Sequence, residues 1–522
     1  MKTTRKVLAY LIVAMMIVAM LPNALATGTL TTYTITIENS VEGHTYEAYQ
    51  VFIGDYSSGK LSNIEWGSGI TSDGQTQLEN MYDNAETKSA GGVAKALTGD
   101  NPVDPVSFAK EAASRLSGVK AESTYDATNK VYKISGLEPG YYLVMDKSGS
   151  LTGQNDAYTA FILSVAGNVS AKPKSAKPTV DKQVQDEVGD AESDAVDGWG
   201  ETADHAINES FQFKLIATLP ADANFGAYET YKVEFVDAMS NGVTFESIAS
   251  VVVDGVTLTS DQYLCTASAD QEGGQWTLTI NDIKSVSGVN LTDGAVITVI
   301  YNAHLNENAQ INHQSGQTDN KNEVTLKYSN NPNASGSGHT DLGETPKDTV
   351  WVFTYQVDNT KVDATDPANK TPLAGAGFKL YDSTGTTEIG LIYDDSLSAY
   401  RPVKAGETAE EMMSASNGVF NIKGLDAGTY VLKETTVPDG YNKCSDTTVV
   451  ISATHAEAAD GSSATTTLSE NANLTNTIEN KSGATLPSTG GMGTTIFYVV
   501  GSILVIGAVV LLVSKKRMNA AD

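Results

Sequence analysis

The sequence has little cysteine, little histidine and none of the motifs that mark common catalytic sites. Its 522 residues include two cysteines, Cys265 and Cys444, so a disulfide framework cannot stabilise a chain of this length. The six histidines are isolated and show no metal-ligand spacing. No Gly-rich phosphate loop and no evident nucleophile–histidine–acid arrangement is present. We therefore expect no metal, no cofactor and no enzyme active site.

Basic residues are also scarce relative to acidic ones. The chain has 34 lysines and arginines against 63 aspartates and glutamates, a formal net charge of −29. Such a surface repels nucleic acid and anionic membranes, so we expect neither as a partner. Long amphipathic helical patterns are few, while Thr, Val, Gly, Asn and Tyr are plentiful. This composition and length predict a mainly β protein of three tandem β-sandwich domains.

The N-terminus has the pattern of a secretory signal peptide. Lys2, Arg5 and Lys6 precede an apolar run over residues 7–21, and Ala24-Leu25-Ala26 follows. A basic start, a short apolar middle and small residues at alternate positions are typical of such a peptide. We expect residues 1–26 to be removed on export.

Three signals follow one another near the C-terminus. The pentapeptide Leu486, Pro487, Ser488, Thr489 and Gly490 precedes an apolar run over 496–513, which ends in Lys515-Lys516-Arg517. The apolar run is long enough to cross a membrane, and the basic cluster holds its end on the cytoplasmic side. An ordinary membrane anchor is the alternative. The order resembles the LPXTG sorting signal of Gram-positive surface proteins, which implies that a sortase cuts between Thr489 and Gly490.

Strand-like segments and polar joints divide the rest of the chain. The first unit opens with an alternating strand at 31–37 and contains a predicted helix from Pro105 to Leu116. A short stretch rich in lysine and proline follows and is typical of a linker. The predicted parts are an N-terminal domain (27–171), a linker (172–178), a middle domain (179–345), a C-terminal domain (346–481) and the sorting signal (482–522).

Strand alternation places polar side chains on the core face of the middle domain. Lys182 is in phase with Val180 and Val184, Asp237 with Val233 and Phe235, and Asn322 with Val324 and Leu326. A lone buried lysine, acid or amide is energetically unfavourable, so these three would have to meet. The alternative is a frame slip at the strand ends, with all three residues solvated.

The third unit repeats this arrangement. Lys361 is in phase with its strand's apolar residues, as are Glu434 and Asn480 with theirs. In both units the lysine lies on the first strand, the asparagine on the last and the acid between them. The same order occurring twice favours the buried interpretation over two independent frame slips.

An internal amide bond is the chemistry that would use such a trio. The lysine amine attacks the asparagine carboxamide and ammonia leaves. The amine must be neutral and the acid protonated, and burial shifts both pKa values in those directions. The fold supplies the high effective concentration, so no cofactor is needed.

The whole chain resembles the major (backbone) pilins of Gram-positive bacteria, in the isopeptide-forming fimbrial family. The motifs that carry this resemblance include Lys361-Val362-Asp363, Tyr430 to Thr435, Phe235 to Gly242 and the sorting signal. The third unit is similar to the collagen-adhesin B-type repeat. The resemblance implies three Ig-like, collagen-adhesin-like β-sandwich domains in an elongated array.

The resemblance also implies where the bonds form. It pairs Lys182 with Asn322, assisted by Asp237, and Lys361 with Asn480, assisted by Glu434. Asn320 remains a rival acceptor for Lys182. The first unit is similar to pilin N-terminal domains but shows no convincing trio, so we predict no bond there.

Backbone pilins carry a donor lysine between their first two domains, commonly in the motif Tyr-Pro-Lys-Asn. This chain has Lys172-Pro173-Lys174-Ser175, which lacks the Tyr and the Asn. Lys174 keeps the Pro-Lys register and is the predicted partner of Thr489. Lys172 and Lys177 remain candidates, and a merely solvated linker is the alternative.

The resemblance implies a structural shaft subunit that is exported, polymerised and anchored to the cell wall as a fimbrium. Implied partners are a pilin-class sortase, copies of this chain, minor tip and base pilins, and peptidoglycan through a housekeeping sortase. The main alternative is a wall-anchored adhesin that never polymerises and binds a host or matrix ligand. A secreted enzyme on a stalk is a third alternative, for which the sequence offers no evident pocket.

Overall fold

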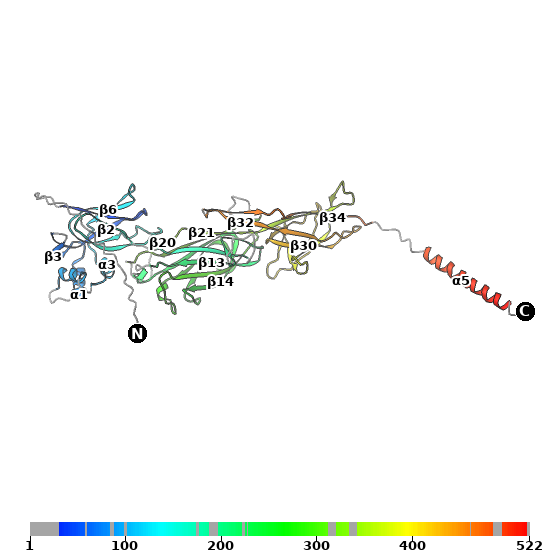
Figure 1. Ribbon diagram of the computed structural model, residues 1–522, viewed down its shortest axis with the longest axis horizontal. Coiled ribbons are helices and arrows are strands. Elements are labelled where there is room, and N and C mark those ends of the chain that lie inside the picture. The colour runs from blue at the N-terminus through cyan, green and yellow to red at the C-terminus, as the bar shows by residue number, and fades with distance from the viewer. Residues whose placement is uncertain are drawn as a thin grey trace.

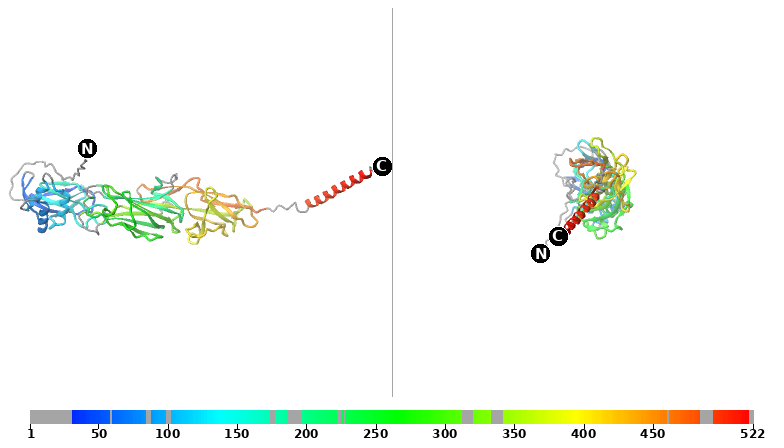
Figure 2. Two further views of the ribbon diagram at one scale, coloured as in Figure 1. Left: turned by 90° about the horizontal axis from the view of Figure 1, so that it is seen from below. Right: turned by 90° about the vertical axis from the view of Figure 1, so that its right-hand side faces the viewer.

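The computed structural model describes residues 31–57, 60–83, 88–98, 102–173, 177–186, 197–221, 225–226, 228–311, 320–332, 342–459, 461–483 and 493–518. The predicted signal peptide, Lys174 and the pentapeptide 486–490 lie outside them. The predicted mainly β class is confirmed, and the sheets follow one another along a single long axis (Figures 1 and 2).

The first unit is built in three layers, two sheets and a layer of helices. One sheet contains β5 (Thr124–Asp126), β6 (Val131–Leu137), β1 (Tyr33–Ile37) and β9 (Val169–Ala171). The other contains β3 (Lys60–Trp66), β2 (Tyr46–Ser57), β7 (Gly140–Asp146) and β8 (Ala160–Val165), with β4 (Ala121–Glu122) on β2. Strand β2 is buried on both faces: Tyr46 and Ala48 pack on the first sheet, while Tyr49 and Val51 pack on the helices.

The helices of this unit are α1 (Ser72–Tyr82), α2 (Ala90–Ala96) and α3 (Pro105–Ala113). The helix predicted from Pro105 to Leu116 ends three residues early, because Leu116 forms an isolated antiparallel bridge with Ile70. Sequence analysis missed α1 and α2. The first begins at a capping hydroxyl, where Thr71 Oγ1 accepts a 3.1 Å hydrogen bond from the Gly74 N–H. The second is short and contains two glycines, so its helical signal is weak.

The middle unit is formed by one large sheet that folds over its own core. Its main order is β11 (Trp199–Gly200), β10 (Thr179–Gln185), β13 (Ser210–Thr218), β18 (Val296–Leu305), β14 (Val233–Val253), β19 (Lys321–Ser329), β21 (Asp348–Phe353) and β12 (Thr202–Asp204). Paired to these are β15 (Val256–Thr257), β16 (Leu264–Cys265), β17 (Gln271–Ile280) and β20 (Leu342–Glu344), and the 3₁₀ turn η1 spans Ile283–Ser285.

The long strand β14 joins the two halves of this sheet. Residues Val233 to Met239 pair with β17 and β19, whereas Val243 to Val253 pair with β18. Register shifts between Phe245 and Ser247 and again after Ile248 bend the strand. The bend carries one strand across both layers, so residues of β10, β14, β18 and β19 face a common interior.

The third unit has two facing sheets. The first contains β23 (Thr371–Pro372), β22 (Tyr355–Asp363), β29 (Ile422–Leu425), β27 (Ala399–Pro402) and β26 (Leu391–Asp394), with β34 (Thr475–Asn480) on β22. The second contains β25 (Glu388–Ile389), β24 (Gly377–Tyr381), β30 (Gly428–Thr436) and β31 (Thr447–Ile451), with β28 (Met412–Met413) on β24. A separate hairpin pairs β32 (Ala453–Glu457) with β33 (Ala464–Leu468).

Hydrogen bonds cross both joints between units. At the first joint, the Tyr158 N–H donates to the Asn330 carbonyl at 2.6 Å. At the second, the Ile207 N–H donates to the Gly424 carbonyl at 2.9 Å. Strand β21 belongs by hydrogen bonding to the middle sheet, and β22 of the third unit begins two residues after β21 ends. The chain thus passes directly from one sandwich into the next.

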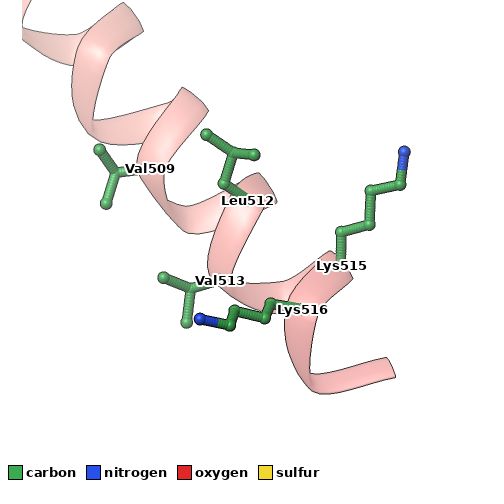
Figure 3. Close-up of a pocket in the computed structure, with 5 residues that line it drawn as sticks. All are labelled: Val509, Leu512, Val513, Lys515 and Lys516. Carbon is green, nitrogen blue, oxygen red and sulfur yellow. The ribbon is translucent and has the colours of Figure 1, made fainter. Parts of the chain in front are cut away.

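The C-terminal helix α5 (Gly493–Met518) lies beyond the third unit (Figure 1). Its candidate membrane span runs from Ile496 to Arg517, and an 18-residue window within that span has a mean hydropathy of 2.9, which is long and apolar enough to cross a membrane. In its last turns, the apolar side chains of Val509, Leu512 and Val513 give way to Lys515 and Lys516 (Figure 3).

Candidate cross-linking sites

Lys182 lies on β10 with a fully buried side chain. Its Nζ forms an ion pair with Asp237 of β14 and lies 3.2 Å from the hydroxyl of Tyr301 on β18. The rings of Phe213 and Tyr301 lie 5.2 and 5.4 Å from Nζ. The amine is therefore held in an aromatic enclosure, with Asp237 as its carboxylate partner.

Burial sets the electrostatics of this site. It lowers the pKa of the Lys182 amine and raises the pKa of the Asp237 carboxyl, although the attraction between the two groups opposes both shifts. Burial also raises the pKa of Tyr301 well above its ordinary value, so its hydroxyl keeps its proton. Both shifts run in the direction that an attack on an amide needs, which is toward a neutral amine and a protonated acid.

Sequence analysis missed Tyr301, whose hydroxyl lies at the centre of the trio. This hydroxyl is 3.2 Å from each carboxylate oxygen of Asp237 and accepts a 2.5 Å hydrogen bond from Asn322 Nδ2. Lys182 and Asn322 are therefore both within hydrogen-bond distance of one oxygen. Tyr301 is an ordinary inward residue in the alternation of β18, so nothing in the sequence distinguishes it from a core tyrosine.

The rival acceptor Asn320 has other hydrogen-bond partners. Its Nδ2 donates to the Gln310 carbonyl and its Oδ1 accepts from the Gln310 N–H, both at 2.8 Å. Asn322 lies within β19, opposite Met239 of β14 and two residues along the register from Asp237. The geometry favours Asn322 as the amide that faces the lysine.

The third unit brings its trio into direct contact. Lys361 Nζ on β22 donates to Asn480 Oδ1 on β34 at 2.6 Å, and Asn480 Nδ2 donates to Glu434 Oε1 on β30 at 2.7 Å. Lys361 Nζ is 3.4 Å from the same Glu434 oxygen, and both of these side chains are fully buried. One carboxylate oxygen of Glu434 thus contacts both the Lys361 amine and the Asn480 amide nitrogen.

The two sheets of the third unit position these groups from opposite sides. Strands β22 and β34 are parallel neighbours, with Asp363 opposite Asn480, so the first and last strands of the unit lie side by side. Glu434 reaches in from the facing sheet, and its other oxygen accepts the Cys444 N–H at 2.8 Å. Cys444 itself is half-buried, and burial raises the pKa of its thiol.

The linker lysines within the described residues differ in their contacts. Lys172 is exposed, and no hydrogen bond of its side chain is seen among the described residues. Lys177 is partly covered, and its Nζ donates to the Asn155 carbonyl at 2.8 Å. Lys172 is thus more accessible than Lys177, while Lys174 lies outside the described residues.

Comparison with known families matches two parts of the chain. Residues 357–464 match a family described as the SpaA prealbumin-like fold domain. Residues 478–520 match the LPXTG cell wall anchor motif. The finer resemblance of the third unit to the collagen-adhesin B-type repeat is not confirmed by these matches and stays a prediction.

Two curated relatives extend over most of the chain. The trypsin-resistant surface T6 protein of Streptococcus pyogenes is 23% identical over 66% of this chain and 70% of its own length. The type 1 fimbrial subunit of Actinomyces viscosus is 25% identical over 68% of this chain and 67% of its own length. Among solved structures, the T6 backbone pilin of S. pyogenes superposes with a TM-score of 0.53 at 17% identity, covering 88% of this chain and 100% of that one. This last likeness shows a shared fold.

Fold, anchor and sheet order define a cell-wall-anchored surface protein of Gram-positive bacteria, built from Ig-like domains. Together with the SpaA domain match and the two relatives, they support a Gram-positive major pilin, as the sequence predicted.

Proposed function

We propose that this chain is the shaft subunit of a sortase-assembled pilus, joined head to tail by Thr489-to-Lys174 bonds and strengthened by internal Lys182–Asn322 and Lys361–Asn480 bonds. Pilin subunits of this kind are structural proteins and not enzymes. The partners are a pilin-class sortase, copies of the chain, minor tip and base pilins, and peptidoglycan.

One observation supports the proposal of internal Lys–Asn bonds. In two successive units, a fully buried lysine on the first strand lies with a buried acid and a buried asparagine from a later strand. In the third unit the lysine and the asparagine share a hydrogen bond, and in the middle unit both contact the Tyr301 hydroxyl. Such groups would be unfavourable in an apolar core unless they served each other. The Lys Nζ attacks the Asn Cγ, a C–N bond forms, and the acid passes the amine proton to the leaving nitrogen, which departs as ammonia.

The placement of the bonds suits a protein under tension. In the third unit the bond would tie the first strand, β22, to the last, β34, and in the middle unit it would tie the first strand, β10, to β19, which β20 and β21 follow in the same sheet. Load would then pass through the cross-link instead of peeling these strands apart. Between the units, β21 continues into β22 after Thr354. A tensile force applied to the two ends would then be transmitted through the middle and third units along a short, largely covalent path.

An extract of the cell wall tests polymerisation. We expect an SDS-resistant ladder that contains this chain and that disappears in Lys174→Ala, while Lys172→Ala and Lys177→Ala keep it. A ladder that persists in Lys174→Ala would move the donor elsewhere. Single copies in every sample would favour the alternative of a non-polymerising adhesin.

Intact mass tests the internal bonds independently. The folded mature protein should weigh less than its sequence by the mass of two ammonia molecules. A mass equal to the sequence mass would contradict both bonds.

A further inference from the structure

A third cluster of buried polar groups lies at the joint between the middle and third units. The hairpin β32–β33 of the third unit extends back toward the middle unit (Figure 1), where β32 lies near β12. Its residue His455 contacts Thr202 of β12 through a 2.7 Å hydrogen bond between Nδ1 and Oγ1. The fold thus brings together residues 253 positions apart in the sequence.

Two carboxylates face the other nitrogen of this imidazole. His455 Nε2 lies 3.9 Å from Asp186 Oδ2 and 4.0 Å from Asp204 Oδ2. The side chains of His455, Asp186 and Asp204 are 0%, 1% and 3% exposed. Asp186 directly follows β10, and Asp204 ends β12, so both carboxylates come from the middle unit and the imidazole from the third.

The geometry of these groups suits a small divalent cation. One ligand atom from each residue lies within 4.8 Å of the other two. A transition metal about 2.0–2.2 Å from nitrogen and oxygen donors holds those donors about 3–4 Å apart. A set of one imidazole and two carboxylates suits Zn²⁺ and similar ions, because Ca²⁺ and Mg²⁺ prefer oxygen donors alone.

The partners of these side chains orient them as in metal sites. The Thr202 hydroxyl engages His455 Nδ1, which leaves Nε2 to face the carboxylates. The Tyr355 hydroxyl donates to Asp204 Oδ2 at 2.9 Å. In metalloproteins, hydrogen-bond partners that do not bind the metal themselves fix the direction of the ligand side chains in this way. A cation between the two carboxylates would also offset their mutual repulsion.

We infer that Asp186, Asp204 and His455 form a binding site for one divalent transition-metal cation, which clamps the β32–β33 hairpin of the third unit onto the middle unit. This clamp is separate from the covalent cross-links, since it shares no residue with either trio. It restrains the angle between two units that the chain itself joins through Thr354.

Zn²⁺ uptake by the full mature chain tests this inference. After treatment with EDTA, the protein is dialysed against Zn²⁺ and its metal content is measured. We expect one Zn²⁺ per chain, at least ~100-fold weaker binding in Asp186→Asn, and ~10- to 100-fold weaker binding in Thr202→Val, which removes only the orienting hydroxyl. His304→Gln is the matched control, because His304 pairs with Glu246 at 2.7 Å and does not belong to this cluster of ligand atoms.

The Glu209→Gln variant distinguishes metal binding at this site from metal binding at a neighbouring group of possible ligands. His205, Glu209 and Asp426 form a second group whose ligand atoms lie within 4.8 Å of one another. Uptake that is lost in Glu209→Gln but kept in Asp186→Asn would overturn the inference, as would absence of uptake by the unaltered chain or equal uptake by Asp186→Asn.

Hydrogen exchange supplies a readout that does not depend on the folding of Asp186→Asn. Zn²⁺ should slow exchange in β32–β33 of the unaltered chain at a concentration that has no effect on Thr202→Val. Equal exchange with and without Zn²⁺ in the unaltered chain would contradict the clamp. Neither result alters the intact mass, so this test is independent of the covalent bonds.

Discussion

The middle and third units place the same three kinds of residue at the same points of a sandwich but connect them differently. In the third unit, Glu434 touches both Lys361 and Asn480 through one oxygen. In the middle unit, the shorter Asp237 contacts Lys182, and the Tyr301 hydroxyl lies between that pair and Asn322. Asp237 is one methylene shorter than Glu434. We infer that the Tyr301 hydroxyl spans the remaining distance between the Asp237–Lys182 pair and Asn322.

A second difference concerns how each lysine meets its amide. Lys361 Nζ already donates to the Asn480 carbonyl oxygen at 2.6 Å, so the carboxamide is turned with its oxygen toward the amine. In the middle unit, the nitrogen of the Asn322 carboxamide points toward the site of the lysine, because it donates a hydrogen bond to the Tyr301 hydroxyl. The third site therefore depends most on its acid, and the middle site on its acid and its tyrosine together.

The largest expected effect is that of Glu434→Ala. The variant should keep the middle bond and lose the third, so its mass should lie one ammonia, instead of two, below the mass of its own sequence. Loss of a cross-link between residues 119 apart should lower the free energy of unfolding of the third unit by roughly 5 kcal/mol, by analogy with disulfide loops. Intact mass and thermal unfolding measure both effects. Glu479→Gln is the control, because Glu479 lies on β34 but pairs with Lys370 at the surface; an unchanged mass deficit in Glu434→Ala would refute the role of the acid.

The choice of acceptor in the middle unit gives the next largest effect. Asn322→Ala should lose the middle bond, so its mass should lie one ammonia, instead of two, below the mass of its own sequence. Asn320→Ala should keep the bond but lower the free energy of unfolding by ~1–3 kcal/mol, because both backbone groups of Gln310 lose a buried partner. If the mass deficit changes in Asn320→Ala instead, the acceptor is Asn320.

Tyr301→Phe should slow the middle bond without abolishing it. Removing a hydroxyl that contacts a charged group weakens an interaction of about 1.5–3 kcal/mol, which corresponds to roughly 10- to 100-fold in rate. The fraction of unbonded chains after a short expression pulse, read by intact mass, measures this rate. Tyr328→Phe is the control, since that buried hydroxyl contacts Asn155 and neither trio. Equal rates in Tyr301→Phe and the unaltered chain would remove Tyr301 from the mechanism.

The smallest expected effect concerns the first unit, for which no cross-link is predicted. Burial alone would lower the pKa of His44, but the hydrogen bonds that its imidazole donates to Asp146 and Asp156, together with their negative charges, outweigh it and raise that pKa to about 9. A histidine whose pKa is higher in the folded chain stabilises the fold fully below its unfolded value of about 6.5, and this contribution is lost as the pH rises to about 9.

Calorimetry between pH 6.5 and 9 measures this loss. The unfolding temperature of the first unit should fall by a few degrees, while the cross-linked units change less. His44→Gln should remove the dependence and His304→Gln should keep it. A first unit whose unfolding temperature is constant over this range would contradict the expectation.

The sequence predicted the buried trios because strand alternation has a strict period of two. Once Val180 and Val184 face the core, Lys182 must face it as well, and the same holds for Asn322 beside Val324. In the first unit periodicity found α3 but missed α1 and α2, and α2 is too short and too rich in glycine to show a pattern. It also could not distinguish Tyr301 from a core tyrosine.

The sequence by itself determined the C-terminal anchor signal, the mainly β class, and the lysines, acids and asparagines that point inward, because these depend on local order and alternation. Only the tertiary structure decided which of those groups touch, that a hydroxyl of β18 lies between Lys182 and Asn322, and that His455 meets Asp186 and Asp204. These contacts join strands far apart in the chain, and the packing of sheets and domains, which no local pattern encodes, sets their distances.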